Sequence, residues 1–471
     1  MRPCARAAAP LRALLARYDG LGAAAPAPRA ASSNAWPGAG GNGGHGGGPG
    51  GGVSASLAAA GGSSTNNMRV LVTGAAGQIG SDLVPFLARR LAPGAVLATD
   101  LRPPTAAANA ANAATTTATS TATSTTTLDC TDAAAFAALA REHRCTHIVH
   151  LAALLSARGE QDPDLAIRVN SRGTEAALAA ARAQGAALLL PSTIGVYGLT
   201  PEARRAGLPS SDDPEANPGR PRTLYGVTKA YAEGLGGWYA RAHGVDFRAL
   251  RLPGVLSATA PGGGTTDYAL HMLERAVEGV MGQEDKRRSA PSLPPYRCFV
   301  DEAVALPFMH ASDTLRAFWG LLSAPRGALS RAVYNVGAVT ATPREWRGAL
   351  ERAAREAVGG GARAEEEEEE QGGSPPPPPP PLLSVEYAPD HRDAIARSWP
   401  ASLDCSAAAR DWGYAPEVAG VDAMARRLLA ERLAARRRAE EEAAVVAPPL
   451  PPPLQPSAAE WRRPLQVAVA A

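Results

Sequence analysis

Three glycines at a fixed spacing constrain the possible folds of this chain more than any other feature. Gly74, Gly77 and Gly80 follow Met68–Thr73, an apolar run that predicts a buried strand, and precede Ser81–Leu91, whose pattern predicts a helix. The first glycine permits a tight turn, the second lets the backbone approach a pyrophosphate, and the third lets helix and strand pack closely. The helix N-terminus then offers free N–H groups to phosphates. The arrangement predicts a dinucleotide-binding fold.

An acidic residue at the end of the next strand indicates which dinucleotide is bound. Val96–Thr99 predicts a second strand, and Asp100 ends it about 20 residues beyond Gly80, where such folds place a ribose-binding acid. Its carboxylate can accept hydrogen bonds from both hydroxyls of an unphosphorylated ribose. Asp100 therefore favours NAD over NADP, although Arg102 nearby points slightly the other way.

The following segments alternate between strand and helix patterns. Strands are expected at 146–151, 187–190 and 247–252, and helices at 136–142, 165–182 and 225–243. Alternation with continuous apolar strands predicts an α/β fold with a Rossmann-like, doubly wound parallel sheet. We expect an NAD-binding domain at 68–255 and a smaller C-terminal substrate domain at 256–435, from which strands and helices return to the first.

The chain has 48 glycines and 42 prolines, concentrated in patches that interrupt the pattern. Residues 105–127 are mostly Ala, Thr, Ser and Asn, and residues 358–381 contain a glutamate run and a proline run. Both lack the apolar content needed to fold, so they are expected to be surface insertions. Residues 436–471 are expected to form a disordered tail.

The first 67 residues are typical of a targeting segment followed by a linker. Residues 1–30 hold five arginines and a single acid, Asp19, and four apolar residues between 11 and 18 fall on one helical face. Such an Arg-rich, acid-poor amphipathic start predicts an organelle transit peptide, mitochondrial in preference to chloroplast. An alanine-rich disordered tail is the alternative. The glycine-rich stretch that follows predicts a flexible linker.

Tyr225 and Lys229 form the second motif, because residues four apart share one helical face. An ordinary tyrosine, with a pKa of about 10, is a poor base. A neighbouring ammonium and the positive nicotinamide of an oxidised cofactor would favour its phenolate. Tyr225 is therefore the candidate base, and Lys229 its positively charged partner and a candidate ligand of the nicotinamide ribose.

Ser192 and Thr193 end a predicted strand on the side of the sheet where open α/β folds bind ligands. A hydroxyl there could hydrogen-bond the substrate oxygen whose proton Tyr225 removes. Taken alone, a Ser-Thr pair after a strand is more often a turn or a helix cap. Its combination with the Tyr–Lys helix makes Thr193 the third candidate catalytic residue.

Together these motifs resemble the extended short-chain dehydrogenase/reductase superfamily, which includes nucleotide-sugar epimerases and dehydratases. The resemblance rests on Gly74–Gly80, Asp100, Asp129, Leu151–Leu154, Asn170–Thr174, Ser192–Thr193, Tyr225–Lys229 and Arg251–Gly254. Further segments are similar to L-threonine 3-dehydrogenases of the short-chain type, which are mitochondrial in animals. These are Ala153–Ala157, Pro191–Gly195, Arg220–Thr223, Pro261–Ala269, Ala394–Pro400 and Asp411–Gly413.

The resemblance implies NAD-dependent oxidation of the β-hydroxyl of L-threonine to 2-amino-3-oxobutyrate, with Tyr225 as base. It implies cofactor contacts from Gly74, Gly77, Gln78, Ile79, Gly80, Asp100, Leu101, Arg102, Asp129, Cys130, Leu151, Ala152, Ala153, Asn170, Tyr225, Lys229, Pro253 and Val255. It implies substrate contacts from Ser156, Ser192, Thr193, Tyr225, Thr265, Thr266 and Asp267. Asp267 is either a partner of the substrate ammonium or a helix cap. Arg204 and Arg222 are candidates for the carboxylate.

Other readings follow from the same sequence. A nucleotide-sugar epimerase or dehydratase with tightly bound NAD would use the same Tyr, Lys and Thr, and a non-catalytic NAD-binding scaffold is the third reading. The net charge of +2 gives no basic field for nucleic acid, and no apolar run is long enough to span a membrane. Five scattered cysteines indicate neither disulfides nor a metal site. The family's usual form implies a homodimer through the helices at 165–182 and 225–243.

Overall fold

The computed structural model describes residues 67–102, 124–200, 202, 204, 220–257, 264–284, 294–359 and 381–446. The predicted transit peptide and linker, most of both insertions and the end of the tail lie outside these ranges. Among the described helices, none is both long enough and apolar enough to cross a membrane.

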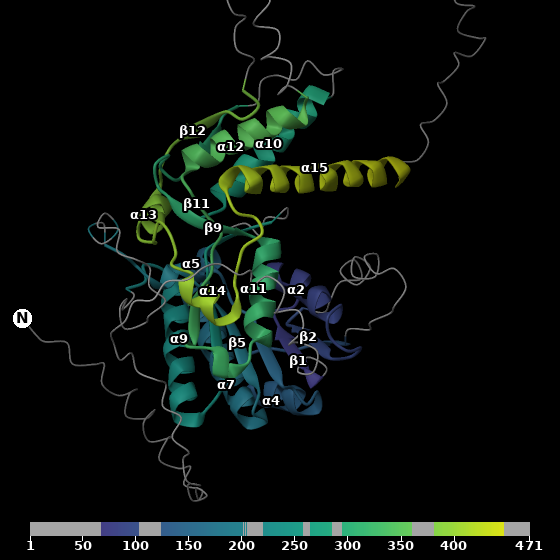
Figure 1. Ribbon diagram of the computed structural model, residues 1–471, viewed down its shortest axis with the longest axis vertical. Coiled ribbons are helices and arrows are strands. Elements are labelled where there is room, and N and C mark those ends of the chain that lie inside the picture. Colours follow the sequence, from purple (N-terminus) through teal and green to yellow (C-terminus); the bar gives the residue numbers. More distant parts are fainter. Residues whose placement is uncertain are drawn as a thin grey trace, which may run out of the picture. The chain divides into compact units, whose positions relative to one another are not determined.

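A parallel seven-stranded sheet forms the centre of the fold (Figure 1). Its strands are β1 (Val70–Thr73), β2 (Val96–Asp100), β3 (Ser124–Thr127), β4 (His147–His150), β5 (Ala187–Thr193), β6 (Phe247–Leu252) and β10 (Val333–Asn335). They lie in the order β10-β6-β5-β4-β1-β2-β3, and every pair in the sheet is parallel. The strand order reverses between β1 and β4, which is where such sheets bind ligands.

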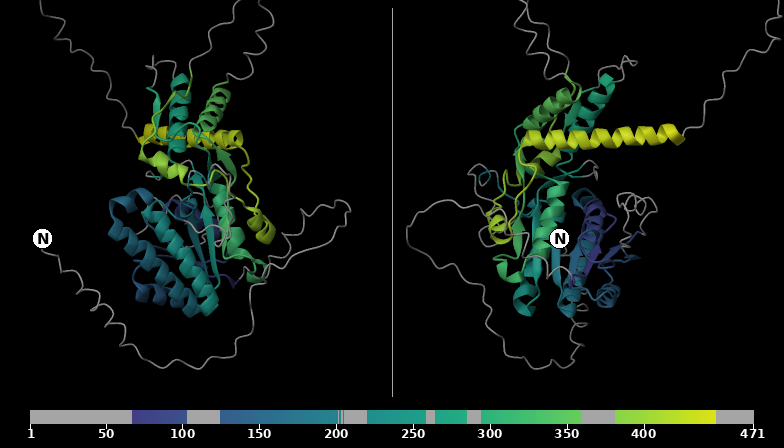
Figure 2. Two further views of the ribbon diagram at one scale, coloured as in Figure 1. Left: turned by 90° about the vertical axis from the view of Figure 1, so that its left-hand side faces the viewer. Right: turned by 45° about the vertical axis from the view of Figure 1, so that its right-hand side comes forward.

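Helices cover both faces of this sheet, as Figure 2 shows from two further sides. These helices are α2 (Gln78–Ala88), α4 (Ala133–Glu142), α7 (Gly173–Gln184), α9 (Leu224–His243) and α11 (Ala311–Ser323). Successive strand residues enter opposite cores: Leu189 packs with α2 and α11, whereas Leu188 and Leu190 pack with α4, α7 and α9. The predicted Rossmann-like doubly wound sheet is confirmed.

A second, smaller group of elements follows β6 directly. Its strands are β7 (Gly254–Leu256), β8 (Tyr296–Cys298), β9 (Leu306–His310), β11 (Val339–Ala341) and β12 (Val385–Tyr387). Its longer helices are α10 (Tyr268–Glu284), α12 (Pro343–Ala357) and α15 (Val421–Val446), with the shorter helix α13 (His391–Arg397). They enclose a core of their own, centred on Tyr268, Phe308 and Trp346. The helix α14 (Ser406–Trp412) instead buries Ala407 and Ala408 in the core between the seven-stranded sheet, α2 and α11.

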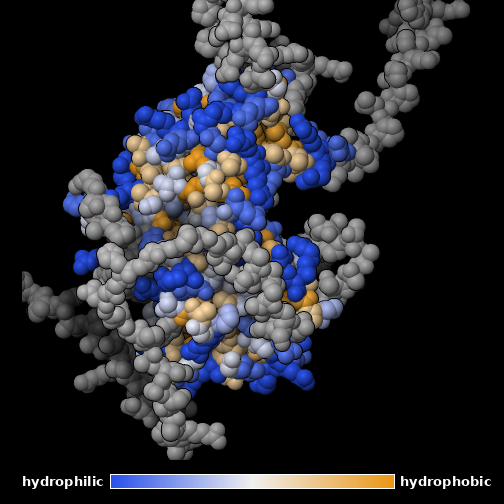
Figure 3. Space-filling view, viewed as in Figure 1, coloured by the Kyte–Doolittle hydropathy of each residue, from blue (hydrophilic) through white to orange (hydrophobic). Residues whose placement is uncertain are grey.

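Two segments predicted to be unstructured are ordered in part. The last four residues of the 105–127 insertion form β3, which pairs with β2 at the sheet edge. An edge strand is held by backbone hydrogen bonds, and β-branched threonines favour it without apolar burial. Likewise α15 continues past residue 435, because Ala, Arg and Glu are strong helix formers. On the face drawn in Figure 3, hydrophilic side chains gather over α12 and α15, which the ion pair Arg352–Asp422 links.

The single helix expected at 165–182 is interrupted. It divides into α6 (Pro163–Ile167), a π-helical turn at Arg168–Arg172 and α7. Such π-bulges insert a residue into a helix and often occur at functional sites. Here the turn carries Asn170 into the interior, where it is 4% exposed.

Candidate active site

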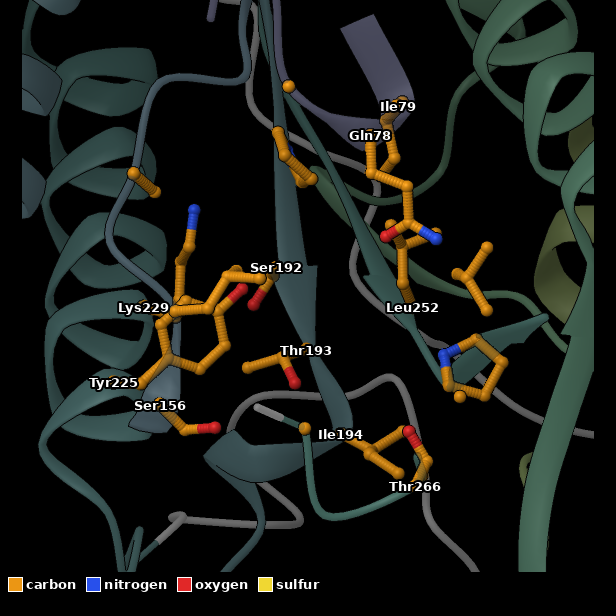
Figure 4. Close-up of a pocket in the computed structure, with 18 of the residues that line it drawn as sticks. Gln78, Ile79, Ser156, Ser192, Thr193, Ile194, Tyr225, Lys229, Leu252 and Thr266 are labelled. Atoms are coloured by element: carbon orange, nitrogen blue, oxygen red, sulfur yellow. The ribbon is translucent and has the colours of Figure 1, made fainter. Parts of the chain in front are cut away.

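A cavity of about 260 Å³ opens at the carboxyl ends of β1, β4, β5 and β6 (Figure 4). It is lined by Gly74, Gly77, Gln78, Ile79, Gly80, Leu151, Ala153, Leu155, Ser156, Pro191, Ser192, Thr193, Ile194, Tyr225, Lys229, Leu252, Pro253, Gly254, Val255, Gly264, Thr265, Thr266, Asp267 and Trp399. Most of the residues predicted from sequence are therefore brought together in one place.

The glycine loop has the geometry that a pyrophosphate requires. Gly74 has a φ of +69°, and a Cβ added there would lie 2.6 Å from the backbone nitrogen of Ala152. A Cβ on Gly80 would lie 2.7 Å from Cα of Ala75, so only glycine lets the helix start this close to the loop. The N-cap of α2, Gly77, has no side chain to cap the first N–H groups. Those groups remain available to an anion.

Asp100 lies beside this loop, as expected of a ribose-binding acid. Its Oδ2 accepts a hydrogen bond of 3.0 Å from the Ala76 N–H, and its Oδ1 accepts one of 3.1 Å from the Arg102 N–H. Leu101 is 67% exposed, an unusual position for a large apolar side chain. The glycine cradle and the carboxylate at the end of β2 together fit NAD.

Asp129 and Cys130 lie outside the cavity lining. Asp129 Oδ1 accepts hydrogen bonds from the N–H and the hydroxyl of Thr131, at 2.9 and 2.8 Å. Cys130 is buried, and burial followed by the charge of Asp129 raises the pKa of its thiol to about 11. Their contact with the adenine end of the cofactor stays a prediction.

Tyr225 and Lys229 project from the first turns of α9, which begins after the N-cap Thr223. The Lys229 Nζ lies 5.7 Å from the centre of the Tyr225 ring. Burial lowers the pKa of Lys229 to about 8, against the opposing charge of Glu233, and burial raises the pKa of Tyr225 above its ordinary value. The tyrosine is therefore protonated in the free protein at neutral pH, and further positive charge is needed before it can act as a base.

Ser192 and Thr193 place their hydroxyls differently, because successive strand residues face opposite sides. Thr193 Oγ1 accepts a hydrogen bond of 3.1 Å from the Gly195 N–H, which leaves its own hydrogen to point into the cavity. Ser192 Oγ instead donates to the carboxylate of Glu233. The single hydrogen of the Ser192 hydroxyl is therefore used by Glu233, while the residue still lines the cavity, and its contact with the substrate stays a prediction.

Asn170 holds the loop after β4 rather than lining the cavity. Its Oδ1 accepts from the Leu154 N–H at 2.8 Å, and its Nδ2 donates to the Leu154 carbonyl and to Thr228 Oγ1, both at 3.0 Å. Leu151 and Ala153 line the cavity, whereas Ala152 packs against Gly74. A direct contact between Asn170 or Ala152 and the cofactor stays a prediction.

The predicted substrate residues line the cavity from two sides. Ser156 begins the short helix α5 (Ser156–Gln161), and Thr265, Thr266 and Asp267 precede α10. Asp267 is 6% exposed, and its Oδ2 accepts from the Gly264 N–H at 2.8 Å. This bond runs back into the loop that precedes α10, and the role of Asp267 as partner of the substrate ammonium stays a prediction.

Neither arginine proposed for a substrate carboxylate lines the cavity. Arg204 donates to the carbonyls of Ala396, Trp399 and Ala305. These bonds direct its guanidinium toward backbone carbonyls, and a contact between Arg204 and the substrate carboxylate stays a prediction. Arg222 is exposed before α9 and is not among the lining residues.

Two residues that the sequence analysis did not select belong to the site. Trp399 lines the cavity, is 7% exposed, and its buried Nε1 has no hydrogen-bond partner within the described residues. An indole N–H without a partner is rare in a folded interior and marks a position that a ligand can satisfy. Glu233 lies one turn beyond Lys229 on α9. The signal for Trp399 was its place in the Ala394–Pro400 segment, and the signal for Glu233 was its four-residue spacing from Lys229.

Comparisons with known proteins show which chains this one is similar to. The model of the "NAD dependent epimerase/dehydratase family" matches residues 70–337. The mitochondrial L-threonine 3-dehydrogenase of Sus scrofa is 33% identical over 354 residues, covering 75% of this chain and 79% of that protein. The structure of L-threonine 3-dehydrogenase from Trypanosoma brucei has a TM-score of 0.61 at 35% identity, covering 77% of this chain and 96% of that one. UDP-glucose 4-epimerase from Thermus thermophilus, in complex with NAD, has a TM-score of 0.55 at 25% identity and covers 78% of this chain and 99% of its own.

Proposed function

The chain belongs to the NAD-dependent epimerase/dehydratase family, and from that membership we propose that it oxidises L-threonine at its β-carbon to 2-amino-3-oxobutyrate. Its similarity to L-threonine 3-dehydrogenases identifies it as an NAD-dependent oxidoreductase. The observation that carries the proposal is the cavity in which Tyr225, Lys229 and Thr193 face the loop that ends at Asp267.

Tyr225 is the proposed base. In Figure 4 its ring lies between Ser156 and Ser192, near Thr193 and with Lys229 behind it. The charge of Lys229 favours the phenolate, which takes the proton of the β-hydroxyl, while Thr193 donates a hydrogen bond to the same oxygen. When bound, NAD supplies the acceptor for the hydride that leaves the β-carbon.

The two ends of an amino acid match polar groups that line the cavity from two sides. The buried carboxylate of Asp267 is the proposed partner of the ammonium. The substrate carboxylate requires donors, and the described lining residues include no arginine, so the Trp399 N–H and the Ser156 hydroxyl are the proposed donors.

Trp399→Phe tests the carboxylate contact. We expect KM for L-threonine to rise about 3- to 10-fold with little change in kcat, because one hydrogen bond is worth about 0.5–1.5 kcal/mol. Steady-state kinetics at saturating NAD measures this. Trp412→Phe is the matched control, because its Nε1 is also buried without a partner but lies outside the cavity lining. An unchanged KM in Trp399→Phe would rule out the contact.

We also propose that the chain forms a homodimer through α9 and the preceding helices. Val227, Tyr231 and Trp238 lie on α9 at helical spacing and are 48%, 42% and 48% exposed, and Ile167 on α6 is 48% exposed. Large exposed apolar side chains that cluster on one face are typical of protein interfaces.

The basic N-terminal segment and the mitochondrial relatives support a mitochondrial location.

Trp238→Glu tests the dimer. We expect the full chain to be a dimer at micromolar concentration and the variant to be a monomer, because a charge buried in an apolar interface is unpaired. Light scattering coupled to size-exclusion chromatography measures the mass. Val358→Glu, at an exposed apolar residue away from α9, is the control. A monomeric wild type contradicts the proposal.

Incubation of the full chain with NAD and either L-threonine or UDP-glucose tests the function itself. We expect NADH to appear only with L-threonine. Conversion of UDP-glucose to its epimer without net NADH would instead support the nucleotide-sugar alternative.

A further inference from the structure

A chain of buried polar side chains links the catalytic helix to the sheet beneath it. Glu233 on α9 accepts the Ser192 hydroxyl from β5, and it forms two hydrogen bonds with Arg251 on β6, from Nε at 2.9 Å and from Nη2 at 2.7 Å. The side chains of Glu233 and Arg251 are 9% and 4% exposed. Each oxygen of the carboxylate is therefore paired inside the protein.

The arginine is fixed in turn from its other side. Its Nη1 donates to the Tyr197 hydroxyl at 3.0 Å, and that hydroxyl donates to Asn335 Oδ1 on β10 at 2.7 Å. Burial alone would lower the pKa of Arg251, but the hydrogen bond and charge of Glu233 outweigh it and raise the pKa. The guanidinium is thus a permanent charge held in one orientation.

Glu233 also lies one helical turn from Lys229, on the same face of α9. Three other ionisable groups are relevant to Lys229. Tyr225 is on the same helix, His150 on β4 has its pKa lowered to about 3 by burial and then by Lys229, and Arg251 is paired with Glu233. His150 is neutral at pH 7, so Glu233 supplies the negative charge that opposes the burial of Lys229.

A buried ion pair often stabilises a fold less than apolar residues of similar volume would. The carboxylate of this pair also accepts the Ser192 hydroxyl, and that hydrogen bond connects the two elements that carry the candidate catalytic groups. Thr193 follows Ser192 directly on β5, and Tyr225 and Lys229 share the helix of Glu233. A carboxylate in that place fixes the distance between strand and helix and adds charge at the base of the site.

We propose that Glu233 is a positioning residue, which holds the Tyr225–Lys229 helix against the strand of Thr193 and keeps the Lys229 ammonium charged. Its part in turnover rests on the proposed function. Its effect on Lys229 does not, because the charge of Lys229 can be measured without any substrate.

Glu233→Gln tests the effect of the charge. The sequence contains two lysines, Lys229 and Lys286, so lysine labelled with ¹³C at Cε gives two NMR signals, and the second is an internal reference. We expect the titration midpoint of Lys229 in the full chain to fall by about 1 pH unit, the effect of losing one charge about one turn away. The signal from Lys286 should not move.

Tyr197→Phe is the matched control, because it removes a hydrogen bond from Arg251 but leaves the Glu233 charge in place. We expect this variant to lose thermal stability without shifting the Lys229 midpoint. An unshifted midpoint in Glu233→Gln, or an equal shift in Tyr197→Phe, would overturn the proposal.

Ser192→Ala tests the positioning effect. It leaves no buried charge without a partner, so this variant can test the positioning claim even if Glu233→Gln does not fold. It removes one hydrogen bond to Glu233 and keeps the pair with Arg251. We expect kcat for L-threonine to fall about 10-fold with KM and the Lys229 midpoint unchanged, because only the relative placement of strand and helix is altered. Wild-type kcat in this variant overturns the positioning claim.

No turnover by the wild type would contradict the proposed function alone, and the NMR titration would still decide the effect of the charge.

Discussion

Tyr225→Phe lowers kcat for L-threonine oxidation by about 10²- to 10⁴-fold, the usual contribution of a positioned acid–base group. The ring still fills its place beside Lys229, so only the proton-accepting oxygen is lost. Burial raises the pKa of this tyrosine in the free protein, and bound oxidised NAD and Lys229 lower it. The wild-type rate therefore rises with pH as the hydroxyl loses its proton, and the variant loses that rise. Steady-state kinetics between pH 6 and about 10 measures both effects.

The binding of NAD provides the control for this variant. Titration calorimetry should still detect NAD binding in Tyr225→Phe, because the glycine loop and Asp100 are untouched. Near-wild-type kcat in the variant would mean that another group is the base.

Asp267→Asn raises KM for L-threonine by about 30-fold or more. The buried carboxylate is the proposed partner of the substrate ammonium, and leaving a buried charge without its partner costs about 2–5 kcal/mol. Asparagine keeps an oxygen for the Gly264 N–H, so the loop should retain its shape. Initial rates over a range of threonine concentrations measure the change.

Asp132→Asn is the matched control for this substitution. Asp132 caps α4, away from the cavity, and asparagine is an equally good cap. If KM in Asp267→Asn equals that of the control, Asp267 belongs to the loop alone and does not bind the ammonium.

Features that depend on spacing within one segment could be predicted from the sequence. The glycine loop, Asp100 and the Tyr225–Lys229 pair are each set by a turn, a strand end or a helical repeat. Local geometry sets the direction of these side chains. The doubly wound fold and the NAD cofactor that they predicted are confirmed.

Features that depend on partners far along the chain could not be predicted. The direction of Ser192 depends on Glu233, 41 residues away, and Arg204 is occupied by carbonyls that lie 101 to 195 residues further on. The unpartnered indole N–H of Trp399 indicates a ligand-binding position only because Trp399 lines the cavity, and the other walls of that cavity come from the sheet. Tertiary contacts of this kind leave no periodic trace in the sequence.

Low-complexity composition led to wrong predictions for two segments that form regular secondary structure with little apolar burial. The edge strand β3 needs only backbone pairing with β2, and the end of α15 needs only residues with high helix propensity. Composition alone cannot distinguish such segments from unstructured ones.

The most direct test of the account follows the hydrogen on the β-carbon of the substrate. The full chain is incubated with NAD and L-threonine that carries deuterium at Cβ, and the reduced cofactor is analysed by mass spectrometry. We predict that the deuterium appears in the reduced cofactor in equal amount to the 2-amino-3-oxobutyrate formed, and that Tyr225→Phe slows the formation of both to the same extent. Reduced cofactor without deuterium, or no reduction with NAD remaining bound, would contradict the oxidation of L-threonine at its β-carbon.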